Sequence, residues 1–406
     1  MPELNPKILV WARETAGFSL NEAAHKLDIN TTRRQTGEQR LLEIESGVSQ
    51  PTRSQLVRMA KLYRRPLLTF YMLSPPVAGE RGQDFRTLPA EYSNSQKALV
   101  DALIRDVRAR QEIASYLVRV EEDVSPIAFV GSMTTRSGYK AVLESIKTNL
   151  NIDLLQFRSN SNKGSNPTGF KYLRRQAEKA GIFVSLVGNL GSHTTTFDIE
   201  TFRGIALADK FAPFIVINDQ DSEKAWSFTL LHELCHIWLG QTGISSQKAT
   251  SALEVFCNSV AAEFLIPEAE TPEFEGFKGL SFQELQTQIS RVAEAKNVSS
   301  SMVAYRLLSL GVIDQGNWSR LSVWFRNAWL SKKQSLKEAN KENDGGPNYY
   351  VVKRHKIGES LVSLARRNLA EGNISPIKAS SMLGVKPTSV YSLVNPAPNL
   401  SSGKAA

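Results

Sequence analysis

The sequence has few cysteines and no long apolar run, and these absences exclude several classes of protein. Two cysteines in 406 residues cannot form a disulfide framework. No apolar segment approaches the roughly 18–20 residues that cross a membrane as a helix. The first residues, MPELNPKILVWARE, lack the basic head and apolar stretch of a signal peptide. We therefore expect a protein with no membrane association, in the reducing cytoplasm.

The sequence has fewer acidic than basic residues, and the basic excess lies at the two ends of the chain. The sequence has 40 Asp and Glu against 49 Lys and Arg, a formal net charge of +9. Residues 1–70 contain 11 basic and 7 acidic residues, a difference of +4, and residues 331–406 contain 12 and 5, a difference of +7. Basic ends can contact phosphate backbones, although a solvated surface has the same composition.

The first 70 residues have the pattern of several short helices. Ser19 and Glu22 have the spacing of a capping box, in which the serine caps a helix start. Gly17 and Gly47 end helices, and Thr52 opens the fourth one. Four or five short helices joined by tight turns are typical of the helix-turn-helix layout.

The middle of the chain mixes helices with strands. Strands are predicted at residues 182–187, 204–208 and 213–218, and a helix follows from near Ser222. Beyond a polar segment at 331–348, residues 357–393 are again helical. The expected architecture is therefore α+β in the middle and all-α at both ends.

The predicted helix after Ser222 contains the pattern His232-Glu233-Leu234-Cys235-His236. Residues four apart on a helix lie about 40° apart around it, so both histidines can reach one ion. Glu233 lies on the adjacent face, where it can act as a general base on a metal-bound water. The alternative is a buried core helix that happens to hold two histidines. We favour a zinc site because a buried glutamate beside two histidines is costly unless it is paired or near a metal.

A catalytic zinc needs a third protein ligand, and the next predicted helix offers two carboxylates. Glu254 and Glu263 are nine residues apart, on opposite sides of that helix, so only one can face the histidines. We prefer Glu254, because it lies nearer the helix face that carries Asn258 and Ala261. Cys235 and Cys257 are interpreted as small buried core residues rather than ligands.

Three blocks of this region resemble the ImmA/IrrE family of metallopeptidases, over residues 168–267. They are FRGIALADKFAPFIVIND, FTLLHELCHIWLG and EVFCNSVAAEFLIP. Near the N-terminus, SLNEAAHKL, IESGVSQPT and LVRMAKLYRRPLLTFYM resemble an XRE-type helix-turn-helix domain. QDFRTLP at 83–89 and GNISPIKASSMLGVK at 372–386 resemble the joint and the helical tail of long family members.

The resemblance implies a role for each matching residue. His232, His236 and Glu254 match the family's zinc ligands, and Glu233 matches its catalytic glutamate. It also implies a gluzincin-like fold in which an edge strand, here 213–218 or its neighbour, pairs with an extended peptide. Members act on regulatory proteins, often repressors. The residue that stabilises the oxyanion is not identified; His193, Tyr172 and Arg203 are the candidates.

The complete expectation is a multidomain protein with an all-α helix-turn-helix N-terminal domain, an α+β gluzincin-like metallopeptidase core and a small all-α C-terminal domain. The predicted segments are a helix-turn-helix domain (1–74), a linker and bridging helix (75–125), a zinc metallopeptidase domain (126–330), a polar linker (331–348) and a helical C-terminal domain (349–406).

One segment departs from the helix-turn-helix pattern. Residues 30–37, NTTRRQTG, are polar and contain a glycine where a recognition helix normally begins. This segment either contacts DNA or is a loop, in which case the domain binds only protein. The candidate DNA contacts are Thr31, Thr32, Arg33, Arg34, Gln35 and Arg40.

The predicted function is a DNA-binding transcriptional regulator with a zinc-dependent endopeptidase domain that cleaves a regulatory protein such as a repressor. The expected partners are DNA and that protein substrate, and the paired half-sites that such domains read are compatible with a homodimer. Left open is a regulator or antitoxin-like protein whose zinc site is structural or sensory.

Overall fold

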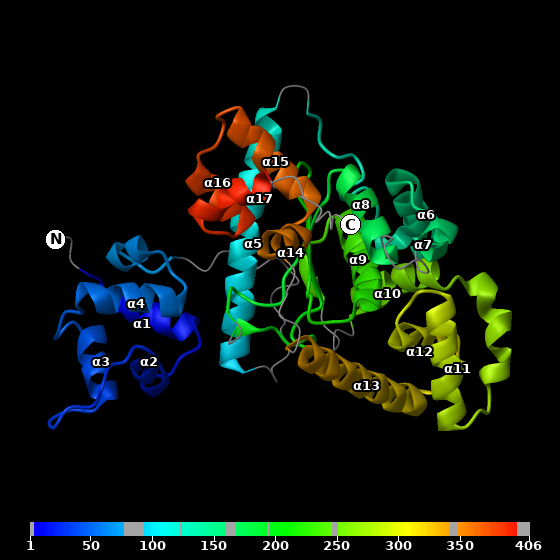
Figure 1. Ribbon diagram of the computed structural model, residues 1–406, viewed down its shortest axis with the longest axis horizontal. Helices are drawn as coiled ribbons and strands as arrows, with labels where there is room; N and C mark the ends of the chain where they lie inside the picture. The colour runs from blue at the N-terminus through cyan, green and yellow to red at the C-terminus, as the bar shows by residue number, and fades with distance from the viewer. Residues whose placement is uncertain are drawn as a thin grey trace, which may run out of the picture. The chain divides into compact units, whose positions relative to one another are not determined.

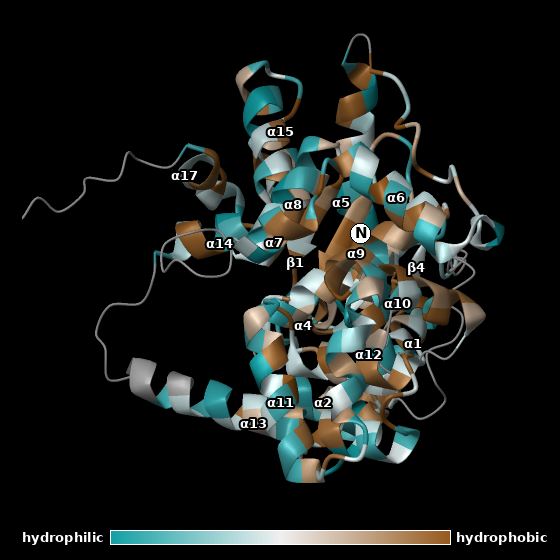
Figure 2. Ribbon diagram, turned by 90° about the vertical axis from the view of Figure 1, so that its right-hand side faces the viewer, coloured by the Kyte–Doolittle hydropathy of each residue, from teal (hydrophilic) through white to brown (hydrophobic). Residues whose placement is uncertain are grey.

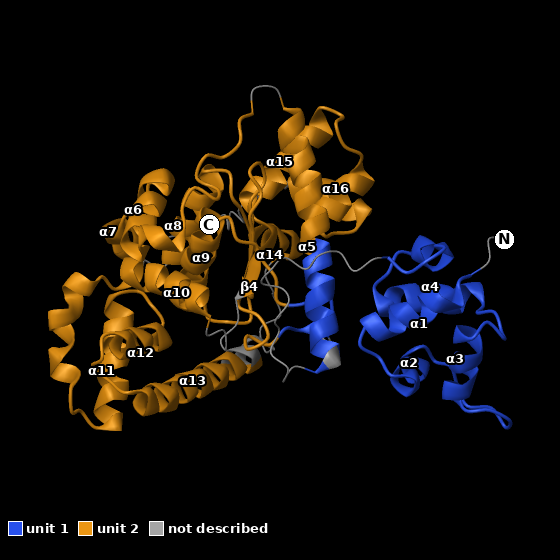
Figure 3. Cartoon of the chain, turned by 180° about the vertical axis from the view of Figure 1, so that it is seen from behind, with its two compact units in different colours: residues 1–106, 189–197 blue, residues 107–188, 198–406 orange. Residues whose placement is uncertain are grey.

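The computed structural model describes residues 4–76, 93–121, 124–159, 168–192, 195–245, 251–341 and 348–395. These residues are mostly helical and include one four-stranded sheet. They form two compact units, residues 1–106 with 189–197, and residues 107–188 with 198–406 (Figure 3). Within the described ranges, none of the helices combines the length and the apolar character that crossing a membrane requires.

The first unit begins with short helices that share a core of their own. The capping box predicted at Ser19 is confirmed, and Thr36 and Thr52 form two more. A buried ion pair between Arg13 and Glu45, with Nε and Oε1 2.8 Å apart, ties the first helix to the third. The helices are α1 (Pro6–Thr15), α2 (Leu20–Lys26), α3 (Gly37–Glu45), α4 (Arg53–Tyr63) and the 3₁₀ helix η1 (Leu67–Tyr71).

The sheet of the second unit has the strand order β1-β3-β2-β4. The three predicted strands are confirmed as β1 (Phe183–Leu186), β2 (Gly204–Leu207) and β3 (Phe214–Ile217), and a fourth strand, β4 (Gly243–Ser245), was not predicted. β1 runs parallel to β3, whereas β2 is antiparallel to both β3 and β4. All residues of β1, β2 and β3 are buried, as expected for strands covered on both faces.

The prediction of an edge strand at residues 213–218 is wrong for β3 itself, whereas β1, which pairs with β3, does lie at one edge of the sheet. β3 lies between β1 and β2, and β2 lies between β3 and β4. The hydrogen bonds of these interior strands are taken by neighbours on both sides, which leaves β4 as the strand at the other end of the sheet. Three residues, Gly-Ile-Ser, are too few to give a strand signal in the sequence.

Two antiparallel helices pack beside this sheet. α9 (Glu223–Trp238) lies on β2 and β3, and α10 (Ala252–Leu265) packs along α9 (Figure 1). The helix predicted to begin near Ser222 does so, with Ser222 as its cap, and Ser251 caps α10 by accepting a hydrogen bond from the amide of Glu254. Much of α9 is apolar (Figure 2), and its polar residues from Ser227 to His236 are buried.

Helices on the outside complete the apolar core of the second unit. α13 (Gln315–Lys341) continues well into the predicted polar linker at 331–348. Its polar residues there lie on a helix that is largely exposed, which is why composition alone suggested a linker. The other helices are the C-terminal part of α5 (Asn94–Val120), η3 (Thr135–Ser137), α6 (Tyr139–Leu150), α7 (Leu154–Ser159), α8 (Gly169–Lys179), η5 (Glu268–Phe277), α11 (Phe282–Ala295) and α12 (Ser300–Ser309).

The C-terminal helices dock onto β1 and α8 through a buried socket around Gly358. Arg174 of α8 donates to the carbonyl of His355, at 2.6 Å, and to that of Val184. Its Nε lies 3.3 Å from Oε1 of Glu178. Gly358 has φ = +104°, and a Cβ there would lie 2.6 Å from Glu178 Oε1. These helices are α14 (Tyr349–Ile357), α15 (Glu359–Ala370), α16 (Pro376–Leu383), η6 (Pro387–Ser389) and α17 (Val390–Val394).

Candidate metal centre

α9 and α10 bring three ionisable side chains to one point. The Nε2 atoms of His232 and His236 lie 3.1 Å apart. The Oε2 of Glu254 is 3.2 Å from Nε2 of His232, and its Oε1 is 3.3 Å from Nε2 of His236. All three side chains are buried, with exposed fractions of 3% for His232, 1% for His236 and 8% for Glu254. Two imidazole nitrogens and a carboxylate therefore converge inside the protein.

These distances fit a divalent metal. A tetrahedral ion with bonds of about 2.0–2.1 Å keeps its ligand atoms about 3.3–3.4 Å apart, close to the 3.1–3.3 Å between the three groups. Two imidazoles and one glutamate are a common ligand set for a catalytic zinc that keeps a fourth position for water. The residues present therefore suit zinc in both chemistry and spacing.

Asn258 fixes the orientation and tautomer of His232. Its Oδ1 lies 2.9 Å from His232 Nδ1, and because an amide oxygen can only accept, Nδ1 carries the proton. In the neutral form of the ring, the lone pair of Nε2 points toward His236 and Glu254. The amide of Asn258 also hydrogen-bonds the hydroxyl of Tyr305 on α12, and burial raises the pKa of that tyrosine. Partners of this kind orient metal-binding histidines and raise their basicity.

Glu254 is ionised at neutral pH. Burial on its own would raise the pKa of its carboxyl, but the hydrogen bonds and charges of His232 and His236 outweigh burial and hold the pKa at about 2. Its position in the first turn of α10 also favours a negative charge, because the N-terminal end of a helix is partially positive.

Glu233 lies one position along α9 from the first histidine, and its side chain is fully buried, with an exposed fraction of 0%. The start of β2 passes directly over it. A Cβ placed on Gly204 would lie 2.2 Å from Glu233 Oε1 and 2.7 Å from its Cδ. The absence of a side chain at residue 204 therefore makes room for the carboxylate.

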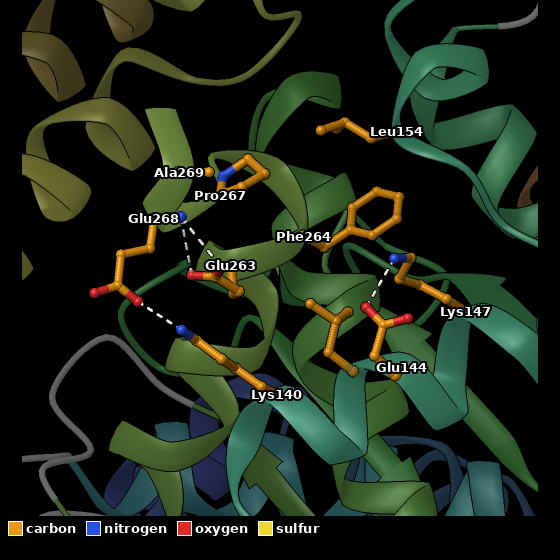
Figure 4. Close-up of a pocket in the computed structure, with 10 residues that line it drawn as sticks. Lys140, Glu144, Lys147, Leu154, Glu263, Phe264, Pro267, Glu268 and Ala269 are labelled. Carbon is orange, nitrogen blue, oxygen red and sulfur yellow. Dashed lines mark hydrogen bonds and ion pairs between the residues drawn. The ribbon is translucent and has the colours of Figure 1, made fainter. Parts of the chain in front are cut away.

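Glu263, the rival for the third ligand, lies elsewhere. Its Oε2 is 2.6 Å from Nη2 of Arg306, and it accepts the amide of Glu268. It borders a groove of about 590 Å³ beside α6 (Figure 4), where Lys140 and Glu268 form another ion pair. The histidines do not line this groove.

The two cysteines are buried and reduced, as predicted. Cys257 nevertheless lies near the histidines, because its Sγ and one ring nitrogen of each histidine lie within 4.8 Å of one another. A hydrogen bond with Cys235 and burial both raise the pKa of the Cys257 thiol. In this arrangement Cys257 is a neutral thiol beside the site.

Of the candidates for oxyanion stabilisation, Tyr172 has a hydrogen-bonding role elsewhere in the fold. The hydroxyl of Tyr172 accepts the amide of Asp153 at 2.9 Å, so Tyr172 holds the turn before α7. The backbone carbonyl of Arg203 accepts the amide of Asn218 at 2.9 Å, just before β2 begins. His193 lies outside the described residues.

Most of the candidate DNA contacts build the connection between α2 and α3. Thr32 Oγ1 accepts the amide of Gln35 at 3.2 Å, and Arg40 donates to the carbonyl of Asn30 at 2.9 Å. Thr31 Oγ1 accepts the amide of Gly37, and the side chain of Gln35 donates to Glu43. Arg33 and Arg34 are exposed, as are Thr31 and Thr32.

Sequence reasoning missed the surroundings of the site. Helical spacing places Asn258 on the same face of α10 as Glu254, but its hydrogen bond to His232 was not predicted. Tyr305 and Gly204 are far away in sequence, and no local pattern connects them with α9 or α10. Their positions follow from how α12 and β2 pack against these helices.

A comparison with protein families supports part of this interpretation. The family model Peptidase_M78, described as the IrrE N-terminal-like domain, matches residues 186–308. This segment contains both histidines and the two glutamates near them. No curated protein and no solved structure matched the chain. Residues 186–308 are therefore similar to the IrrE N-terminal-like domain of the M78 peptidases, which indicates a metallopeptidase-like function for this part of the chain.

Proposed function

We propose that the protein is a zinc-dependent endopeptidase in which His232, His236 and Glu254 hold the metal and Glu233 is the general base. The observation that carries the proposal is the convergence of two Nε2 atoms and one carboxylate at 3.1–3.3 Å. When bound, zinc would supply a Lewis acid and lower the pKa of a water to about 7.

The remaining chemistry belongs to the chain. The carboxylate of Glu233 takes the proton of the attacking water and passes it to the leaving amine. Asn258 keeps the proton of His232 on Nδ1, so that Nε2 is available as a ligand. The negative charge of Glu254 makes the pocket attractive to a cation. Residues of α9 and α10 would therefore supply both the metal ligands and the general base.

Replacing Glu233 by glutamine tests this role, because the amide keeps the shape of the side chain but cannot accept the proton. We expect the variant to bind zinc as the wild type does and to lose about 10²- to 10⁴-fold in kcat. Cleavage of a proteome-derived peptide library, read by mass spectrometry of new N-termini, measures this loss. Equal cleavage by both proteins would exclude a proteolytic role for Glu233.

We further propose that the N-terminal helices bind DNA and that the protein substrate is a regulator such as a repressor. Arg33 and Arg34, exposed just before α3, support the first part. Replacing both with alanine should weaken DNA binding and reduce its salt dependence, because each lost phosphate contact lowers the slope by about 0.9. An unchanged slope in fluorescence anisotropy would leave these arginines without a role in binding.

The second candidate is a regulator whose zinc site is structural or sensory and cuts nothing. The position of Cys257 favours it, since a thiolate there could complete a closed four-ligand site. In that case Cys257→Ser would weaken zinc binding, and Glu233→Gln would leave the function unchanged. For a peptidase, the serine variant keeps both zinc and activity.

A further inference from the structure

At Gly204 the backbone of the sheet closely approaches Glu233 of α9. Gly204 is the first residue of β2, and it pairs with Ile217 of β3 and Ser245 of β4. The neighbouring strands fix its backbone position, so β2 cannot move away from α9 without breaking pairs on both sides.

The atoms nearest to the missing Cβ all belong to one side chain. They are Oε1, Cδ and Cγ of Glu233, at 2.2, 2.7 and 2.8 Å. Such distances are well inside van der Waals contact, so any larger residue at 204 must displace the carboxylate. Gly204 is not needed for an unusual backbone conformation, because its φ lies outside the left-handed region.

We propose that Gly204 is a positioning residue for Glu233, an inference that rests on the proposed peptidase function. The space above its Cα is occupied by the end of the Glu233 side chain. The backbone of β2 thus limits how far the carboxylate of Glu233 can move away from the histidines. A methyl group at this position would push the carboxylate off its place while leaving His232, His236 and Glu254 where they are.

The proposal predicts that a substitution at Gly204 lowers the catalytic rate and leaves zinc binding unchanged. Gly204→Ala should bind zinc with the wild-type affinity, because none of the three nearest atoms belongs to a proposed ligand. Its kcat should fall about 10²-fold or more, approaching that of a protein without the general base, with KM little changed. Gly276→Ala is the matched control: a Cβ there meets no atom within 4 Å, and the variant should behave as the wild type.

A stability measurement tests the contact without any peptidase assay. Residues in contact show non-additive effects, so Gly204→Ala should lower the Tm more in the wild type than in the Glu233→Ala background, where the space is empty. Equal shifts in the two backgrounds would overturn the proposal. If the Gly204→Ala variant does not fold but the double variant with Glu233→Ala does, the contact is supported. If neither variant folds, the added methyl group clashes with something other than Glu233, and the proposal is overturned.

The two failures are distinguishable. A wild-type protein that binds zinc and cleaves no peptide contradicts the proposed function, while the Tm comparison still tests the contact between Gly204 and Glu233. A Gly204→Ala variant with wild-type kcat, in a protein that does cleave peptides, contradicts only the positioning role.

Discussion

Two buried polar clusters in the second unit are built in opposite ways. In the socket around Gly358, the guanidinium of Arg174 faces the carboxylate of Glu178 and two backbone carbonyls, so donors meet acceptors. Between α9 and α10, two imidazole nitrogens and a carboxylate face one another. When His232 is neutral and Asn258 holds its proton on Nδ1, the inner atoms of that histidine and of Glu254 are both acceptors.

The comparison shows which cluster needs a ligand. A buried charge is tolerated when it is paired and hydrogen-bonded, and the socket meets this condition with its own residues. Converging lone pairs repel one another unless a cation lies between them. We therefore expect the socket to serve docking of the C-terminal helices and the α9–α10 site to bind a metal.

The largest expected effect is on the socket. At pH 8, where Glu178 is mostly ionised, Arg174→Ala would leave a buried carboxylate without its cation, which typically costs about 3–5 kcal/mol. Urea denaturation of the second unit should show this loss, while zinc affinity stays unchanged. If Arg174→Ala also weakened zinc binding, the socket and the metal site would not be independent of each other.

Removing the carboxylate of Glu254 should weaken zinc binding, the property that Arg174→Ala leaves unchanged. Changes to outer hydrogen-bond partners of metal ligands cost about 10–100-fold in affinity, and we expect Glu254→Ala to exceed this. Glu263→Ala is the matched control, since Glu263 pairs with Arg306 instead. Zinc content after dialysis distinguishes them, and equal loss in both would refute the ligand assignment.

The socket should also make stability depend on pH. Burial raises the pKa of Glu178 from 4.5 to about 7, in spite of Arg174. Because the folded protein binds this proton more tightly, the stabilisation is complete below pH 4.5 and is lost as the pH rises through 7. At 1.36 kcal/mol per unit, the change is roughly 3 kcal/mol.

Glu178→Gln is the variant that isolates this effect, because the amide stays neutral at every pH. The difference in unfolding free energy between wild type and variant should change between pH 5 and pH 8. A difference that stays constant would show that Glu178 does not titrate in the socket.

The smallest expected effect concerns Asn258. Asn258→Ala removes the acceptor for His232 Nδ1 and should weaken zinc binding about 10–100-fold, whereas Asn258→Asp keeps an acceptor and should retain most of the affinity. Ser259→Ala is the control, because its hydroxyl donates to the carbonyl of Val255 and not to His232. Competition with a zinc chelator measures all three, and equal affinities for the alanine and aspartate variants would exclude the orienting role.

The sequence predicted the parts of the fold that depend on local patterns. Ser19, Ser222 and Thr52 mark helix starts because a side-chain oxygen caps the first amides. The strands β1, β2 and β3 have apolar runs between turn residues. β4 is too short to be recognised, and the polar surface of α13 has the composition of a linker.

The residues of the candidate site were also predictable only where they depend on local patterns. The spacing of His232 and His236 on one helix is a local property, and Glu254 follows after a loop of suitable length. Gly204 and Tyr305 reach the site only through the packing of β2 and α12, and the proximity of Cys257 depends on how α10 lies against α9. Such contacts are set by tertiary structure, which no local spacing encodes.

X-ray absorption spectroscopy of the zinc-loaded protein tests the central claim most directly, because it identifies the atoms bound to the metal. We predict two imidazole rings and further oxygen or nitrogen ligands at about 2.0–2.1 Å, with no sulfur. A sulfur ligand at about 2.3 Å would assign the site to Cys257, and the absence of imidazole would contradict a metal between α9 and α10.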